Sequence, residues 1–225
     1  MFISKISNNP TKQVHTCTDL GITFSNNLSW DKQIEDIRNR SFRKLGMIIR
    51  YCKPMQDIDT ILTLYRALVR STMEYGSVLW IPKTKKDIKS IEDVQARFVR
   101  FLFQKMNGFY PKYPQNIGYR TMLEHLPIQL IETRFKESQI KLLQNALLNK
   151  IDSPYITSKI GFKIPNPKLR RDNKTLFYVP GNRHESFLKS PIVSAMKYYN
   201  DLPDKPDLFY HDIFSLPEEY SDEDE

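Results

Sequence analysis

The 225-residue sequence has few of the residues that several common protein classes require. Its two cysteines, Cys17 and Cys52, are too few for a disulfide framework or for a four-cysteine zinc site. Only seven glycines occur, which argues against a sandwich or barrel with many tight turns. No apolar run approaches the roughly 20 residues that a membrane-spanning helix needs, and the N-terminus has no secretory signal pattern. We therefore expect an intracellular protein, nuclear or cytoplasmic, with no membrane partner.

Basic residues are in excess, but they are unevenly distributed. The whole chain has 34 basic and 26 acidic residues, a net charge of +8. Eight of the acids lie in residues 207–225, which contain no lysine or arginine, so residues 1–206 hold 34 basic against 18 acidic residues, a net charge of +16. A body this basic attracts polyanions, of which nucleic acid is the commonest. Charge alone fits a merely soluble protein equally well.

Hydrophobic periodicity predicts a mainly α-helical fold. A short β-hairpin is expected over residues 12–24, from β-prone segments at 14–16 and 20–24. Three amphipathic helices follow between residues 31 and 103, with starts at Ser29, Asp57 and Asp87. Their inward positions recur at spacings of three and four. These positions are Ile34, Ile37, Ser41, Leu45 and Ile48; then Ile58, Ile61, Tyr65, Leu68 and Thr72; then Ile88, Ile91, Gln95, Phe98 and Leu102.

The second half of the sequence is richer in proline and less regular. A helix is predicted from Pro127, a residue that suits a first helical position, to about Asn149. Its inward residues would be Ile131, Phe135, Leu142 and Ala146. A possible strand at 176–179 and a helix at 191–200 follow, and the acidic residues 215–225 are expected to be disordered. The predicted regions are a hairpin at 1–28, a helical domain at 29–150, an irregular proline-rich part at 151–206 and an acidic tail at 207–225.

Several short segments occur in an order and spacing that resemble one family of proteins. They lie at residues 19–22 (DLGI), 28–30, 64–70 (LYRALVR), 74–76, 80–82, 91–98 (IEDVQARF), 119–120, 130 with 134, 190–192 and 200–203 (NDLP). Together they resemble the C-terminal region of LINE-type, jockey-like non-long-terminal-repeat retrotransposon reverse transcriptases. The resemblance implies a helical thumb-like domain and a connector beyond it, which hold the template–primer duplex. It also implies that residues 1–28 are the edge of the polymerase palm.

Catalytic residues are not expected in this chain. The family carries an aromatic-x-Asp-Asp motif upstream of the Leu-Gly-Ile segment, and paired aspartates there would hold two metal ions. Here Asp19 is the only acid before Leu20. The four histidines show no metal-ligand spacing, and no phosphate-cradling glycine-rich motif occurs. We therefore expect a truncated fragment of an RNA-directed DNA polymerase, without its catalytic palm, a metal or a cofactor, and not an enzyme.

Charge and resemblance together predict non-specific binding to the backbone of RNA or DNA. The expected contacts form two stripes: Lys83, Lys85, Lys86, Lys89, Arg97 and Arg100, and Arg43, Lys44, Arg50 and Lys53. Arg66 and Arg70 lie four residues apart and fit a ridge that tracks phosphates or an ordinary solvated helix face. The alternative to nucleic-acid binding is a protein-interaction scaffold or a non-functional remnant of a mobile element. Such a fragment could self-associate through the surface that would face a palm.

Overall fold

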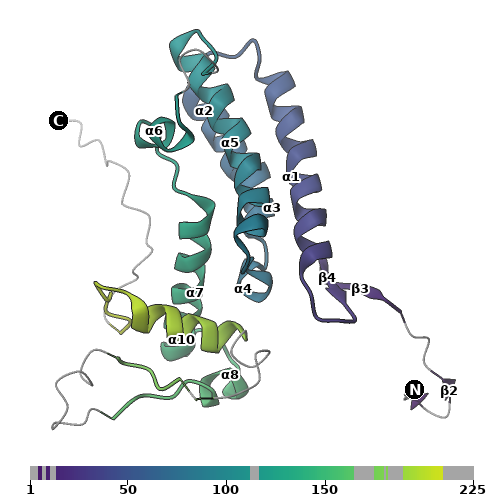
Figure 1. Cartoon of the computed structure of the whole chain (residues 1–225), viewed down its shortest axis with the longest axis vertical. Helices are drawn as coiled ribbons and strands as arrows, with labels where there is room; N and C mark the ends of the chain where they lie inside the picture. Colours follow the sequence, from purple (N-terminus) through teal and green to yellow (C-terminus); the bar gives the residue numbers. More distant parts are fainter. Residues whose placement is uncertain are drawn as a thin grey trace, which may run out of the picture. The chain divides into compact units, whose positions relative to one another are not determined.

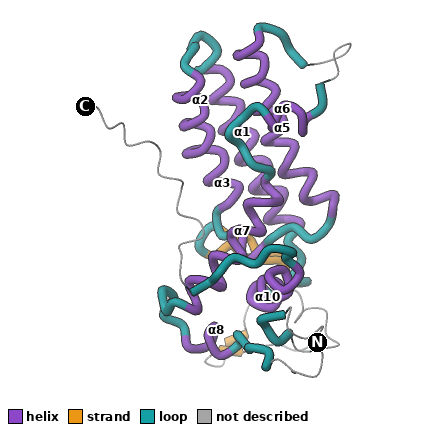
Figure 2. The backbone as a smooth tube through the Cα atoms, turned by 90° about the vertical axis from the view of Figure 1, so that its left-hand side faces the viewer, coloured by secondary structure: helices purple, strands orange, loops and turns teal. Residues whose placement is uncertain are grey.

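The computed structural model describes residues 5–6, 9–10, 14–111, 117–164, 175–179, 181 and 190–209. Over these residues the protein is mainly helical, with an antiparallel hairpin near the N-terminus, as predicted. Figure 2 shows this predominance of helix along the chain. Internal contacts divide the chain into two units: unit 1 is Met1–Gly76 with Pro82–Ile128, and unit 2 is Ser77–Ile81 with Gln129–Glu225. The predicted disordered segment at 215–225 lies outside the described residues.

The second strand of the hairpin in unit 1 begins at Ile22, two residues later than predicted. Strands β3 (Thr16–Asp19) and β4 (Ile22–Ser25) pair with Asp19 opposite Ile22, and a further short pair joins β1 (Lys5–Ile6) to β2 (Asn9–Pro10). Leu20 and Gly21 form the connection, with φ values of 46° and 77°. Positive φ at both central residues suits the twist of a two-residue hairpin. Leu20, predicted within a strand, is therefore a turn residue and 81% exposed.

Helix α1 (Asp31–Tyr51) confirms the first predicted stripe, because all five of its inward residues are buried. The residue before the helix is Trp30, one later than the predicted Ser29. The Ser29 hydroxyl still accepts a hydrogen bond from the Asp31 backbone N–H at 3.3 Å. At the same end, the Gln33 side chain accepts from the Thr23 backbone N–H at 2.8 Å, which fastens the hairpin to the helix.

The second predicted helix is interrupted, and its inward face differs from the prediction beyond Tyr65. It consists of α2 (Ile58–Leu64), the π-helical η1 (Tyr65–Arg70) and α3 (Ser71–Glu74). The predicted Leu68 and Thr72 are only half-buried, whereas Val69 and Met73 are fully buried. A π turn closes i→i+5 hydrogen bonds and so contains an extra residue. That extra residue rotates the following segment, and the buried positions become 61, 65, 69 and 73.

The helical segment ends at Glu74, and the chain turns at Gly76. Gly76 has a φ of 59°, a left-handed conformation that glycine adopts without strain. The next short helix, α4 (Ser77–Trp80), belongs to unit 2.

Helix α5 (Lys85–Asn107) starts two residues before the predicted Asp87. Thr84 caps it, because the Thr84 hydroxyl accepts from the Asp87 backbone N–H at 3.1 Å. Of its predicted stripe, Ile88 is half-buried and the other four residues are buried. Helix α6 (Tyr119–Glu124) packs on α5, and Figure 1 shows α1, α2 and α5 side by side. The Tyr65 and Phe98 rings stack in this core, 3.9 Å apart and nearly parallel.

Unit 2 is organised around α7 (Ile131–Leu147). This helix begins after Leu130 and not at the predicted Pro127, which lies in unit 1. Ile131, Phe135 and Ala146 are buried as predicted, while Leu142 is half-buried. Trp80 of α4 is fully buried and meets the Phe135 ring edge-on at 5.6 Å.

The remaining elements of unit 2 pack on the second half of α7. They are α8 (Pro154–Ser158) and α10 (Pro191–Asp201), the latter confirming the helix predicted at 191–200. The strand predicted at 176–179 is a single antiparallel bridge between Phe162 and Phe177. Their shared core comprises Ile140, Leu143, Phe177, Val193, Ala195, Met196, Tyr199 and Leu208. Leu208, placed in the acidic tail by the sequence prediction, is 1% exposed and belongs to this core.

The side chain of Asn200 attaches the 175–179 segment to α10. Its Oδ1 accepts from the backbone N–H groups of Leu176 and Phe177, both at 3.1 Å, and its Nδ2 donates to the Phe177 carbonyl at 2.8 Å. The described segment has one bridge of its own to Phe162, so these three bonds supply much of its anchorage. No helix among the described residues is long and apolar enough to cross a membrane.

Candidate nucleic-acid interface

The first predicted stripe places four basic side chains on one face of α5. Lys86, Lys89, Arg97 and Arg100 are separated by three, eight and three residues, and a helix with about 3.6 residues per turn places them on one face. The first three are exposed and Arg100 is half-buried. We call these four residues the α5 stripe, which extends about 21 Å at 1.5 Å per residue. One exposed acid, Asp93, lies between its two halves.

The turn before α5 adds positive charge to one end of this stripe. Lys83 in that turn and Lys85, the first residue of α5, are exposed. The N-terminus of a helix carries a partial positive charge, which adds to that of the lysines. Asp87 partly offsets it: besides its backbone bond to Thr84, its carboxylate accepts from the Thr84 hydroxyl at 2.6 Å. The capping bonds hold the turn in a defined geometry.

The second predicted stripe lies on α1 and just beyond it, and Arg43, Lys44, Arg50 and Lys53 are all exposed. Lys44 Nζ donates to the Thr72 hydroxyl at 2.8 Å, and Arg43 Nε donates to the Asn39 carbonyl at 3.4 Å. Both partners are neutral, so neither bond compensates the positive charge.

Lys105 joins the end of α5 to the segment after α1, next to Lys53 of the second predicted stripe. Lys105 Nζ donates to the Lys53 carbonyl and, at 2.8 Å, to the Met55 carbonyl. Arg100 lies five residues before Lys105, about 7.5 Å along the helix. Five residues also turn the helix by about 140°, so Lys105, and not the α5 stripe, faces Lys53.

Two cavities of about 310 Å³ each flank α1 and share Arg40. Ile37, Arg40, Lys44, Ser71, Thr72 and Tyr75 line the first, which we call the Arg40 pocket; Thr18, Gly21, Thr23, Asp36, Asn39, Arg40 and Arg43 line the second. Of the described residues around the Arg40 pocket, none is a carboxylate, whereas the second cavity contains Asp36. The Arg40 pocket is thus the better anion site of the two.

The cations of the Arg40 pocket, and not its hydroxyls, can bind an anion. Tyr75 donates its hydroxyl to the Leu20 carbonyl at 2.9 Å, and Thr72 donates to the Leu68 carbonyl at 2.7 Å. Arg40 uses Nε for the Asp36 carbonyl at 3.4 Å, which leaves its terminal amino groups for a ligand. Arg40 was not among the residues predicted to bind, although it precedes Arg43 and Lys44 of the second predicted stripe by about one helical turn.

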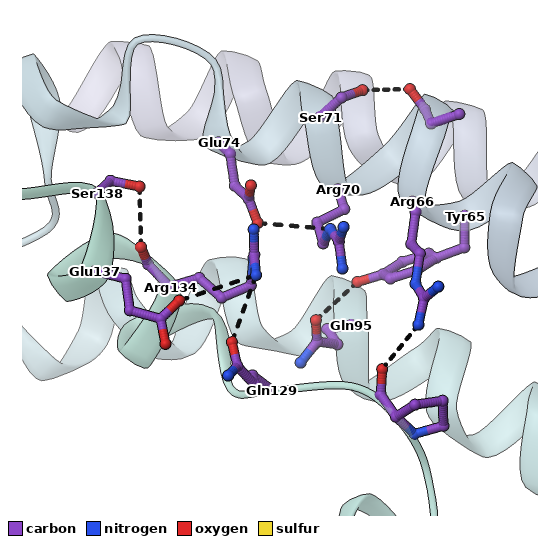
Figure 3. A network of polar contacts seen from close by, with 12 residues as sticks. Tyr65, Arg66, Arg70, Ser71, Glu74, Gln95, Gln129, Arg134, Glu137 and Ser138 are labelled. Atoms are coloured by element: carbon purple, nitrogen blue, oxygen red, sulfur yellow. Dashed lines mark hydrogen bonds and ion pairs between the residues drawn. The ribbon is translucent and has the colours of Figure 1, made fainter. Parts of the chain in front are cut away.

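The two arginines left open by the sequence make structural contacts (Figure 3). Arg66 donates from Nη2 to the Pro127 carbonyl at 3.1 Å. Arg70 lies with its Nε 3.7 Å from the carboxylate of Glu74, one helical turn away. Both arginines are only half-exposed. These contacts favour a role in holding unit 1 together over a ridge that tracks phosphates.

A chain of hydrogen bonds joins η1, α5 and α6. Its residues lie in three of the segments that resemble reverse transcriptases, at 64–70, 91–98 and 119–120. The Tyr65 hydroxyl donates to Gln95 Oε1 at 2.9 Å, as Figure 3 shows. Gln95 Nε2 donates to the Tyr119 hydroxyl oxygen at 2.9 Å and to Glu92 at 3.2 Å, and Tyr119 donates to Glu92. Burial, and then the hydrogen bond to Glu92, hold the pKa of Tyr119 well above its ordinary value. These segment residues therefore act in the packing of unit 1.

Metal-ligating residues do not gather in the described parts of the chain. Among those residues, no group of three or more histidine, cysteine or acidic side chains could hold a metal ion. Cys17 is exposed and Cys52 is buried, and both are free thiols. The candidate interface thus consists of basic side chains on two helices.

Known proteins offer limited comparison. No family model and no solved structure matches the chain. Over 100 residues the chain is 26% identical to an uncharacterized protein of Caenorhabditis elegans, which covers 44% of this chain and 50% of that protein. The chain thus spans about half the length of the curated relative it matches. Because that relative is itself uncharacterized, the likeness indicates no activity.

Proposed function

We propose that this chain binds the sugar–phosphate backbone of RNA or DNA without base preference, inside the cell, in the nucleus or cytoplasm. We further propose that it descends from the thumb and connector of a LINE-type reverse transcriptase and does not itself polymerise DNA. The observation that carries the binding proposal is the α5 stripe, in which four basic side chains share one face of a capped helix. The order of the resembling segments supports the ancestry.

The dimensions of the α5 stripe suit a nucleic-acid strand. Phosphates of one B-form strand recur about every 3.4 Å along the axis and wind around it, so a straight stripe of about 21 Å meets only some of the phosphates along its length. Contacts between lysine or arginine and phosphate fix the position of a protein on the duplex but carry no sequence information. The Arg40 pocket offers a further contact point within the same unit.

Salt dependence provides the first test. We expect a labelled DNA duplex to bind with a slope of log affinity against log salt of about −3.6 to −5.4, if about four to six phosphates are contacted. Replacing Lys86, Lys89 and Arg97 together by alanine should reduce the slope by roughly two to three. The matched control replaces three exposed lysines of unit 2 by alanine and removes the same charge; these are Lys141, Lys150 and Lys197. Fluorescence anisotropy at several salt concentrations measures both slopes.

Outcomes of this titration separate the alternatives. Equal losses in the two triple variants would mean that general charge, and not the α5 stripe, binds the polyanion. No binding at low salt would overturn the nucleic-acid proposal and leave the protein-interaction scaffold, or a remnant without function.

A shortened chain tests the effect of the acidic end. Because Leu208 is buried, the deletion should start after Phe209. It removes seven acids and should tighten binding most at low salt, where screening is weakest.

A primer-extension assay with Mg²⁺ or Mn²⁺ tests the proposal that the chain does not polymerise DNA. Template-directed extension would refute that proposal.

A further inference from the structure

Unit 2 contains an apolar pocket that the proposed nucleic-acid interface does not use. Its volume is about 500 Å³, within the range of about 300–1,000 Å³ that ligand pockets have. Its walls come from α4, α7, α8 and the start of α10, and include Leu79, Leu142, Ile156 and Ile192. Leu79 is 47% exposed, and Tyr155 at the edge is 72% exposed. An apolar surface of this kind suits an occupant with large apolar side chains.

The edge of the pocket carries a positive charge. Lys159 is the one charged side chain among the described residues that line it. Its Nζ lies 4.9 Å from the centre of the Tyr155 ring, so the ammonium group is held at the edge of the pocket by a cation–π contact. The occupant should therefore combine apolar side chains with an adjacent carboxylate.

The chain's own C-terminal segment has this composition. Ile213, Phe214 and Leu216 are followed, after Pro217, by Glu218 and Glu219. These residues lie outside the described part of the chain. In sequence, they join large apolar side chains to carboxylates within seven residues.

The end of the described chain lies within reach of the pocket. Leu208 packs in the same core as Val193, which also lines the pocket, and the Tyr199 hydroxyl donates to the Pro206 carbonyl at 2.7 Å. Helix α10 has 11 residues and is about 16 Å long. A segment that starts at the C-terminal end of α10 must therefore span about 16 Å to reach its first turn. Five extended residues beyond Phe209 span up to about 17 Å. The segment from residue 210 onwards is therefore long enough to return to the first turn of α10.

We propose that this pocket binds residues 213–219 of the same chain, with apolar side chains inside and a glutamate beside Lys159. The tether favours this occupant over a free partner. A short linker gives an effective concentration on the order of millimolar, so even an affinity of about 0.1 mM would keep about nine-tenths of the molecules docked. The proposal is independent of nucleic-acid binding.

A fluorescent label at position 215 tests the docking in the full chain. Cys17→Ser removes the exposed thiol, Cys52 is buried, and Ser215→Cys takes an environment-sensitive dye. Docking predicts a several-fold lower acrylamide quenching constant than in the same protein carrying Phe214→Ser and Leu216→Ser. Those two substitutions change no described residue. Leu79→Glu should also raise quenching, and Leu20→Glu, an exposed position of unit 1, is its control.

Each outcome decides the proposal. Protection that is lost in the Phe214/Leu216 variant and in Leu79→Glu, and that does not change on dilution, supports docking within one chain. Protection that disappears on dilution would mean that a second copy is bound, and would overturn it. Equal quenching in all variants would show that the segment does not dock. Circular dichroism of Leu79→Glu separates loss of docking from loss of folding, and the Phe214/Leu216 variant gives the result if Leu79→Glu does not fold.

Discussion

The π-helical turn in unit 1 makes a sharp prediction about two neighbouring core positions. Periodicity places Leu68 on the inward face, whereas the structure buries Met73 completely and leaves Leu68 half-buried. Alanine at either position keeps a strong helix former, so helix propensity contributes little to the difference. The comparison of Met73→Ala with Leu68→Ala therefore reports which face of the segment is packed.

The expected magnitudes follow from burial. Met73→Ala removes a fully buried side chain and leaves a cavity, which should lower the free energy of unfolding by about 2–5 kcal/mol. Leu68→Ala removes a side chain that solvent already reaches, and complete burial of a leucine contributes about 1.5–3 kcal/mol. We therefore expect a loss of roughly 1 kcal/mol there.

Urea unfolding can follow unit 1 separately. Trp30 lies in unit 1 and Trp80 in unit 2, so a Trp80→Phe background leaves Trp30 as the one tryptophan. With a urea dependence of about 1–3 kcal/mol per molar, Met73→Ala should lower the midpoint by about 1 M or more. If Leu68→Ala proved as destabilising as Met73→Ala, the π-helical conformation of η1 would be contradicted, and the regular helix predicted from periodicity would be favoured.

Three further predictions concern single side chains. The raised pKa of Tyr119 contributes stability that is complete below about pH 10 and is lost progressively above it, so Tyr119→Phe should flatten the alkaline fall in urea midpoint; an unchanged slope would contradict this. Asn200→Ala leaves the backbone N–H and carbonyl of Phe177 without their partner and should lower the free energy of unfolding of unit 2 by about 1–3 kcal/mol. A decrease below about 0.5 kcal/mol would contradict the role of this side chain. Arg40→Gln should weaken duplex binding about fivefold, for a screened contact of about 1 kcal/mol, and Arg38→Gln is the control; equal effects would exclude the Arg40 pocket.

Some features of this protein follow from the sequence by itself. Five of the six buried residues of α1 were predictable, because an uninterrupted α-helix repeats every 3.6 residues and an apolar stripe then defines one face. The sixth, Gln33, is buried where its side chain bonds the hairpin. The same reasoning located the exposed side of α5, where Lys86, Lys89 and Arg97 share a face. Local patterns of this kind depend only on residues within a few turns of one another. The mainly helical class and the candidate stripes could be predicted for that reason.

Tertiary structure alone decided the features that join distant parts of the chain. The π turn at η1 shifts the buried face from Leu68 to Val69, and its bonding pattern has no signature in the apolar spacing. The Arg40 pocket needs α1 and α3 side by side, and the bond from Tyr65 to Gln95 spans 30 residues. Such contacts depend on where separate elements meet, which the spacing of residues within one element does not specify.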